Sequence, residues 1–381
     1  MVRLGDVCEI VSGTTPSTNK PEFWDGNIKW ITPAEISNSS YFIYETERHI
    51  TEKAGLKSMP AGTVLLSSRA PIGKVAIAGE PMCCNQGFKN LICSDKIHNR
   101  YLYRYLKNQT EYLNSLGRGA TFKEISKTIV ENIKIPLPPL HIQKKIADVL
   151  DRVNALIEKR KAQIEKLDLL VKSQFIQMFG DPITNPMGWE CVDLETVCTK
   201  ITDGEHVTPS RTTEGIFLLS ARNILSHRID VTDVDFIDES EYERISKRII
   251  PSTGDILISC SGSVGRVARI TDDTRYQMVR SVAILQLTNE IDSVFVEYCF
   301  DTNYMQTQIW KSVNQSSQAN LFQGKIRKLK IPLPPLHLQN QFAAFVEQVE
   351  AQKAHMKHGL ELMELEYKSL MQKCFSGDIF L

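Results

Sequence analysis

The sequence predicts an α+β protein made of two repeated units, each a globular domain followed by a long helix. Three observations lead to this class. The string KIPLPPLH occurs at 134–141 and again at 330–337. Apolar residues after each copy follow the 3- and 4-residue spacing of an amphipathic helix. Before each copy, short apolar runs alternate with polar, glycine-containing loops, as expected of domains that mix strands and helices.

The repeat extends well beyond the shared string, and a repeat of this length decides the architecture. Residues 141–179 align over 337–375 without a gap. The looser upstream matches keep the same order: LGDVCEIVSGTTP with LETVCTKITDGEHVTP, WITPAEI with LLSARNI, and GTVLLSSRAPIGKVA with GDILISCSGSVGRVA. We therefore expect a first domain at 1–141, a first helix at 142–179, a connection at 180–189, a second domain at 190–337, a second helix at 338–375 and a tail at 376–381.

The two helices are expected to pair with each other. Prolines in KIPLPPLH hold the chain extended until each helix begins. A helix over 142–179 is on the order of 55 Å long, at ~1.5 Å per residue, too long to bury its apolar stripe on its own domain. The simplest partner is its duplicate, which predicts an antiparallel coiled coil and two domains related by a pseudo-twofold axis. The alternative is two separate helical arms that each bind another subunit.

Charge and composition point to a folded protein that does not hold DNA by charge alone. The chain has 45 Lys and Arg against 45 Asp and Glu, whereas a protein that binds DNA unaided is usually basic. Acidic residues cluster between Asp230 and Glu243, which we interpret as a solvated loop and helix start rather than a partner-binding patch. No apolar run approaches the ~18 residues of a membrane span, and the start lacks a signal-peptide core, so a cytoplasmic protein is expected.

Catalytic and metal-binding motifs are missing from the sequence. None of the nine cysteines forms a CxxC pair, so reduced thiols are expected and a zinc site is not. There is no GxGxxG turn, no P-loop, no HExxH and no Asn-Pro-Pro-aromatic motif of the amino-methyltransferases. An active site within this chain is therefore not expected.

Polar residues in the loops between strands are the candidates for contact with DNA. Arginine can fork onto guanine, and asparagine or glutamine onto adenine, while lysine, serine and threonine contact phosphates or several bases. The candidates are Thr15, Lys20, Arg69, Lys74, Gln86, Lys89, Arg118 and Thr121 in the first domain, and His206, Arg211, Arg222, Asn223, Arg266, Arg280, Gln315 and Gln318 in the second. Lys74 and Arg266 share a position after glycine, which favours a turn with a phosphate contact. The alternative is that these loops only join strands.

Two variable domains, each followed by a long helix that starts at IPLPPLxxQ, resemble the specificity subunit of a type I restriction-modification system. The resemblance covers essentially the whole chain. It is carried by Ile135–Gln143, by Ile331–Gln339, by Leu4–Gly13 and by the segments that end at Lys74 and Arg266.

The resemblance implies a non-catalytic subunit with two target recognition domains, each of which reads half of a bipartite site in double-stranded DNA. The helices would set the gap between half-sites and dock two modification subunits, with Gln143, Lys159, Gln339 and Lys357 as candidate contacts. Restriction motor-nuclease subunits would join the complex. No cofactor is expected in this chain, and S-adenosylmethionine, ATP and Mg are expected on the partner subunits. A scaffold whose paired domains bind protein ligands is the alternative.

Overall fold

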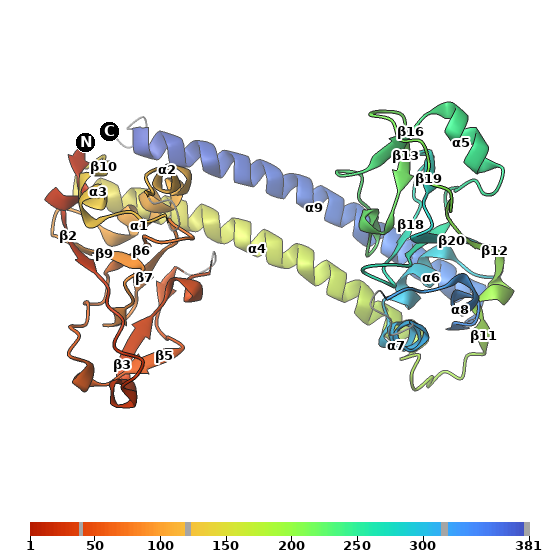
Figure 1. The fold of residues 1–381 in the computed structure, drawn as a ribbon, viewed down its shortest axis with the longest axis horizontal. Helices are drawn as coiled ribbons and strands as arrows, with labels where there is room; N and C mark the ends of the chain where they lie inside the picture. Colours follow the sequence, from red (N-terminus) through yellow and green to blue (C-terminus); the bar gives the residue numbers. More distant parts are fainter. Residues whose placement is uncertain (38–40, 119–122, 314–318, 377–381) are drawn as a thin grey trace. The chain divides into compact units, whose positions relative to one another are not determined.

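The computed structural model describes residues 1–37, 41–118, 123–313 and 319–376. The chain divides into two compact units, which we name unit 1 (Met1–Lys161 with His358–Leu381) and unit 2 (Ala162–Lys357). Each unit contains one globular domain and parts of both long helices (Figure 1). The divisions fall inside the helices and not at the helix starts, because each helix begins in one unit and ends in the core of the other.

The described residues of unit 1 form two larger sheets and one two-stranded pair, and two of the buried strands are nearly continuous apolar runs. The larger sheet has the order β2 (Cys8–Ser12), β9 (Phe88–Cys93), β6 (Val64–Ser67), β7 (Val75–Ala78) and β4 (Phe42–Ile43). The smaller sheet has the order β5 (Arg48–Ile50), β3 (Trp24–Ile31) and β8 (Cys83–Cys84), and β1 (Val2–Arg3) pairs with β10 (Lys134–Ile135). Every residue of β6 and β7 is buried, which explains why these strands read VLLS and VAIA and not as an apolar-polar alternation.

Unit 2 repeats this arrangement with other lengths. Its larger sheet has the order β12 (Cys198–Asp203), β20 (Val282–Leu287), β17 (Ile256–Ser259) and β18 (Val267–Arg269), and its three-stranded sheet has the order β16 (Asp235–Ile237), β13 (Ile216–Leu219) and β19 (Tyr276–Met278). Two further pairs are β11 (Cys191–Asp193) with β21 (Lys330–Pro332), and β14 (Ile224–Leu225) with β15 (Arg228–Ile229). In both units the smaller sheet contains one parallel pair, β3 with β8 and β13 with β19.

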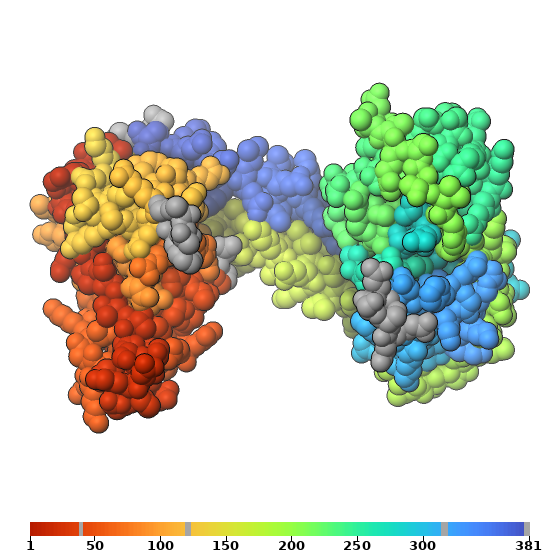
Figure 2. Space-filling model, in the orientation of Figure 1, coloured from red at the N-terminus to blue at the C-terminus, as the bar shows by residue number. Residues whose placement is uncertain are grey.

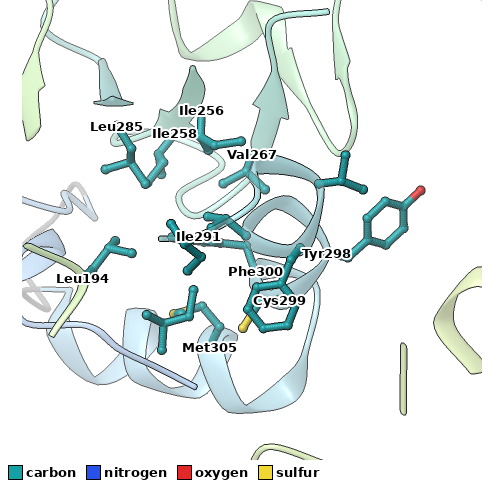
Figure 3. Close-up of a cluster of buried hydrophobic side chains, with 14 of the residues drawn as sticks. Leu194, Ile256, Ile258, Val267, Leu285, Ile291, Tyr298, Cys299, Phe300 and Met305 are labelled. Atoms are coloured by element: carbon teal, nitrogen blue, oxygen red, sulfur yellow. The ribbon is translucent and has the colours of Figure 1, made fainter. Parts of the chain in front are cut away.

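Short helices complete each domain. Unit 1 has α1 (Asn99–Asn108), α2 (Thr110–Ser115) and α3 (Lys127–Asn132), and unit 2 has α5 (Glu239–Ser246), α6 (Ser293–Phe300), α7 (Asn303–Ser312) and α8 (Gln323–Ile326). In unit 2, Ile256, Ile258 and Leu285 of the sheet lie in one core with Phe300 and Met305 of the helical segment (Figure 3).

The duplicated turns keep their hydrogen bonds. The backbone N–H of Lys74 donates to Ser67 Oγ at 2.8 Å, and that of Arg266 donates to Ser259 Oγ at 3.0 Å. The aligned segments WITPAEI and LLSARNI both form short 3-10 helices, at Pro33–Glu35 and Ala221–Asn223. The predicted alignment of the two halves is therefore confirmed by equivalent individual hydrogen bonds and equivalent 3-10 helices.

The long helices α4 (Leu140–Phe179) and α9 (Leu336–Ser376) begin two residues before the predicted starts. Within each unit they run antiparallel, as predicted. In unit 1, Lys161 Nζ lies 2.9 Å from a carboxylate oxygen of Glu364, and in unit 2, Lys353 Nζ lies 2.5 Å from one of Asp168. Since α4 packs on α9 in both units, two unpaired helical arms are excluded.

Each domain is packed on the start of its own helix and on the end of the other. In unit 1, Ile146 and Leu150 of α4 share a core with Met371 and Cys374 of α9. The corresponding core of unit 2 joins the start of α9 to the end of α4, where the rings of Phe175, Phe179 and Phe342 meet Phe295 of α6. These four phenylalanines form five close ring pairs, with ring centroids between 4.8 and 5.5 Å apart.

A buried glutamine fixes the start of each long helix to its domain. The Gln143 side chain accepts a hydrogen bond from the backbone N–H of His98 at 2.8 Å and donates to the carbonyls of Lys96 and Pro138. Gln339 accepts from the backbone N–H of Asp292 at 2.8 Å and donates to the carbonyl of Pro334. Both side chains are fully buried, so the prediction that they contact a partner subunit is wrong.

Gln143→Leu should lower the free energy of unfolding of unit 1 by about 3 kcal/mol, because each buried polar group left unpaired costs ~1–3 kcal/mol. Gln339→Leu should have the same effect in unit 2. Gln163→Leu, on the exposed face of α4, is the matched control and should change little. Chemical denaturation followed by circular dichroism measures all three. Equal stability of the Gln143 and Gln163 variants would show that the buried amide is not what holds the helix start.

Candidate nucleic-acid interface

Four segments of unit 1 meet at one end of the larger sheet. They are the end of β2, the β6–β7 connection, the β8–β9 turn and the residues before α3. The backbone N–H of Ser68 donates to Gly87 O at 2.7 Å, and that of Ile125 donates to Ser68 O at 2.9 Å. A Cβ atom at Gly13 would lie 1.9 Å from Asn85 O, so only glycine allows β2 to leave the sheet this close to the turn.

Unit 2 builds the same frame from different residues. The backbone N–H of Cys260 donates to Ser281 O at 2.8 Å, and that of Leu321 donates to Cys260 O at 2.9 Å. Gly204 takes the place of Gly13, since a Cβ there would lie 2.3 Å from Met278 O. We name these equivalent positions edge site 1 and edge site 2. Edge site 1 comprises Thr15, Arg69, Gln86, Lys89 and Glu124, and edge site 2 comprises His206, Ser261, Arg280, Ala283 and Asn320.

Edge site 1 is filled by an ion cluster. Glu124 accepts hydrogen bonds from Lys89 Nζ at 3.1 Å and from Arg69 Nε at 2.9 Å. Burial alone would raise the pKa of Glu124, but the hydrogen bonds from Lys89 and Arg69 outweigh it and lower the pKa below its usual value. The Lys89 side chain is only 8% exposed. The two predicted cations are therefore brought together, but a carboxylate that was not predicted neutralises part of their charge.

Thr15, Gln86 and Arg118 are further candidates in the segments that form edge site 1, and Lys20 makes a separate contact. The Thr15 hydroxyl donates to Gln86 Oε1, and the Gln86 side chain is exposed. Lys20 Nζ lies 5.1 Å from the centre of the Phe23 ring. Arg118 is exposed, and its backbone pairs with that of Glu124. Edge site 1 thus contains four of the predicted residues, Thr15, Arg69, Gln86 and Lys89, and a fifth, Arg118, pairs through its backbone with Glu124 of this site.

Edge site 2 is open where edge site 1 is filled. Ala283 and Ser261 replace Lys89 and Arg69, and a cavity of about 370 Å³ results. His206, Arg280 and Phe322 line it, with Cys260 and Leu321 among its buried walls. Phe322 is 57% exposed. Residues near 205–215 and near 320–330 reach the surface of unit 2 in the space-filling view (Figure 2).

One carboxylate organises the polar wall of this cavity. Asp203 accepts from Arg248 at 2.8 Å, and its other oxygen lies 2.8 Å from His206 Nε2. The Arg248 guanidinium also donates to the Thr202 hydroxyl at 2.9 Å. His206 is therefore held by Asp203, and the exposed Arg280 side chain, which lines the same cavity, forms no ion pair within the described residues.

Two predicted DNA-contacting arginines of unit 2 are paired with the acidic cluster. Arg211 Nε lies 3.1 Å from Asp235, and Arg222 lies 3.3 Å from the other oxygen of the same carboxylate. Asp238 caps α5, where it accepts from the backbone N–H of Glu241 at 2.8 Å. The acids between 230 and 243 thus serve the unit itself, in line with their interpretation as a loop and helix start.

Three further candidates make contacts inside their own domain. Asn223 is 2% exposed and forms bonds with Ser220 and with the carbonyls of Asp230 and Asp233. Its prediction as a DNA contact is wrong, because no polar atom is left for a base. Lys74 Nζ donates to Pro33 O at 3.0 Å, and Arg266 donates to Ala221 O at 3.2 Å. The shared position after glycine therefore fastens the turn to the neighbouring 3-10 helix.

Three predicted DNA contacts, Thr121, Gln315 and Gln318, lie outside the described residues. The predicted helix contacts Lys159 and Lys357 are exposed on α4 and α9. Across the described parts of the chain, no group of three or more His, Cys, Asp or Glu side chains could hold a metal ion. The described helices also include none that is long and apolar enough to span a membrane.

Comparison with known sequences decides the family. The sequence profile described as "Type I restriction modification DNA specificity domain" matches residues 1–166 and 186–365. The chain belongs to this family. It is 30% identical to the type I restriction enzyme MjaIX specificity subunit of Methanocaldococcus jannaschii, over 99% of this chain and 92% of that protein. The MjaVIII specificity subunit of the same organism is 24% identical over 100% of this chain and 92% of that protein.

Solved structures share the fold of this specificity subunit. One is a chain from a study of complex assembly and conformational transition in a type I restriction-modification system, with a TM-score of 0.65 and 19% identity over 99% of this chain and 97% of that one. Another is the type I specificity subunit from M. genitalium, with a TM-score of 0.58 and 17% identity over 98% and 95% of the two chains.

The carboxylates Glu124 of edge site 1 and Asp203 beside edge site 2 were not predicted, because a pattern of hydrogen-bond donors in the loops does not reveal the acids that orient them. Arg48 was missed as well: it is exposed and stacks on Trp24, with its guanidinium carbon 3.6 Å from the ring centre. The pairing of tryptophans with a distant arginine becomes visible only once β3 and β5 lie side by side.

A second polar cavity of unit 2, about 820 Å³, lies where the β14–β15 turn approaches α4 and α9. His227 Nε2 lies 2.9 Å from Asp301 and Nδ1 lies 3.4 Å from Glu297, and its ring stacks on Tyr298. Lys172 of α4 lies 3.4 Å from Asp301. Burial alone would lower the pKa of His227, but the two carboxylates outweigh it and raise the pKa to about 9.

The charged form of His227 should stabilise unit 2 in a pH-dependent way. Its folded pKa lies above the unfolded value of about 6.5, so the stabilisation is complete below that pH and is lost as the pH rises through about 9. His227→Gln should therefore lower the melting temperature strongly near pH 6 and much less near pH 10. His355→Gln, an exposed histidine of α9, is the control. A deficit of His227→Gln that does not change with pH would rule out the charged pair.

Proposed function

We propose that this specificity subunit reads a bipartite site in double-stranded DNA, one half-site with each unit, through edge sites 1 and 2. The observation that carries the proposal is the pair of edge sites: one backbone frame is built twice, while the exposed side chains on it differ. A scaffold of this kind suits two domains that read different sequences. Side chains that reach base edges supply the sequence information, and contacts to phosphates supply position.

The charge pattern supports a complex in which other subunits make many of the phosphate contacts and this chain makes the base contacts. Affinity for DNA grows with the number of phosphates that a protein neutralises. Most arginines of unit 2 already pair with its own acids, as for Arg211, Arg222 and Arg248. In the proposed complex, modification subunits therefore provide much of the phosphate contact, and this chain, itself without catalysis, provides the base contacts.

The long helices are proposed to dock two modification subunits and to set the gap between the half-sites. Leu169 of α4 and Leu365 of α9 occupy equivalent positions in the repeat and are 65% and 66% exposed. Large apolar side chains left in solvent on a helix are typical of surfaces that other subunits cover. Lys159 and Lys357 remain candidate contacts on the same helices. S-adenosylmethionine, ATP and Mg are assigned to the partner subunits, with restriction motor-nuclease subunits joining in the cytoplasm.

Fluorescence polarisation on duplex DNA tests this function directly. Single-molecule sequencing of the source genome first provides the methylated adenine motif. The chain with a modification subunit should bind that duplex tightly, whereas the chain alone should bind weakly and with a shallow salt dependence. A duplex with one half-site scrambled is the control and should lose most of the affinity. Equal binding of both duplexes would favour a scaffold for protein ligands instead.

Lengthening both helices tests whether they set the gap. Seven residues inserted after Lys161 in α4 and seven after Lys357 in α9 keep the apolar seam in register and add ~10 Å to each helix, or about three base pairs. The gap in the methylated motif should grow while both half-site sequences stay the same. A fixed gap would mean that the helices do not determine the spacing.

A further inference from the structure

One equivalent position of the two units carries an amide side chain in unit 1 and a guanidinium in unit 2, and these two groups complement different DNA bases. Backbone bonds on both sides define the position. Asn85 N–H donates to Ile31 O at 3.1 Å, and Val279 N–H donates to Leu219 O at 2.9 Å. On the other side, the bonds from Ser68 to Gly87 and from Cys260 to Ser281 correspond. Between these anchors stands Gln86 in unit 1 and Arg280 in unit 2, both exposed.

Arg280 differs from the other arginines of its unit. Each of the others has a hydrogen-bond or ion-pair partner inside unit 2, at a carboxylate or a backbone carbonyl. Among the described residues, Arg280 has no such partner. The backbone N–H of Arg280 donates to Glu205 O at 3.0 Å, which fixes the position of its backbone. The guanidinium remains available at the cavity of edge site 2.

The neighbours of this position leave the two side chains different hydrogen-bonding capacity. In unit 1 the Thr15 hydroxyl donates to Gln86 Oε1, which fixes the amide and leaves its Nε2 donors and one lone pair of Oε1. In unit 2 the residue in the place of Thr15 is His206, which Asp203 holds at 2.8 Å. Arg280 therefore keeps its full fork of donors.

We propose that Gln86 and Arg280 are the matched base-reading residues of the two units, with Gln86 reading an adenine and Arg280 a guanine. An amide with one donor and one acceptor complements N7 and N6 of adenine, and a guanidinium fork complements N7 and O6 of guanine. This assignment rests on the proposed function, and it adds which residue reads and which base is read. The cavity that Arg280 lines gives the fork room to align with a base edge.

Selection from a random duplex library tests the assignment with the whole chain in complex with a modification subunit. Arg280→Gln should replace guanine by adenine at one position of one half-site, with guanine preference falling on the order of 10- to 100-fold. Gln86→Arg should make the opposite change in the other half-site. Arg280→Lys keeps the charge and removes the fork, so it should also lose guanine preference.

Arg211→Gln and Arg222→Gln are the controls, because both arginines are paired with Asp235 and should leave the motif unchanged. If Arg280→Gln weakens binding to all sequences alike, or leaves the motif as it was, Arg280 contacts phosphate or nothing and the assignment is wrong. The wild-type bipartite motif still stands in that case. If the wild-type complex selects no bipartite motif, the proposed function itself fails, and the assignment with it.

Discussion

Two buried glutamine side chains fix the geometry on which the rest of the protein depends. Gln143 and Gln339 each connect the first turn of a long helix to the loop that begins α1 or α6. A side chain that satisfies two or three backbone groups in the interior cannot be replaced by an apolar one without leaving those groups unpaired. This explains why the chain repeats IPLPPLxxQ: the prolines hold the approach extended and the glutamine locks the angle at which domain and helix meet.

The locked helix start allows the loops to vary. Both units keep the same bonds around the edge sites, from the close glycine at the end of β2 or β12 to the ladder through Ser68 or Cys260. These bonds are made by the backbone, so they tolerate any exposed side chain. Edge site 1 can hold Lys89 and Glu124 while edge site 2 holds Ala283 and Asn320, and the backbone hydrogen bonds that join the segments are the same. Under the proposed function, a constant backbone frame with variable exposed side chains would let two duplicated domains read different half-sites.

The sequence predicted the architecture because the architecture depends on periodicity and repetition. The helix starts were predicted within two residues, and the match of WITPAEI to LLSARNI marked equivalent 3-10 helices. Side-chain partners were harder to predict, since they depend on contacts between distant segments. Three polar residues predicted to contact DNA or a partner subunit are instead buried and hydrogen-bonded within their own unit: Asn223, Gln143 and Gln339. Arg211 and Arg222, predicted to contact DNA, lie beside Asp235, an ion-pair partner that is distant in the sequence.

The zero net charge of the chain suits a protein that binds particular DNA sequences in preference to DNA in general. A subunit covered with unpaired cations would bind any DNA, because phosphate contacts carry no sequence information. In unit 2, acids at Asp203, Asp233 and Asp235 hold arginines that would otherwise contribute to nonspecific attraction. In unit 1, Glu124 does the same for Lys89 and Arg69. Under the proposed function, the modification subunits supply the general attraction for DNA. The few available donors on each edge site would then make a larger relative difference between a correct and an incorrect base pair, and tight binding would require the assembled complex.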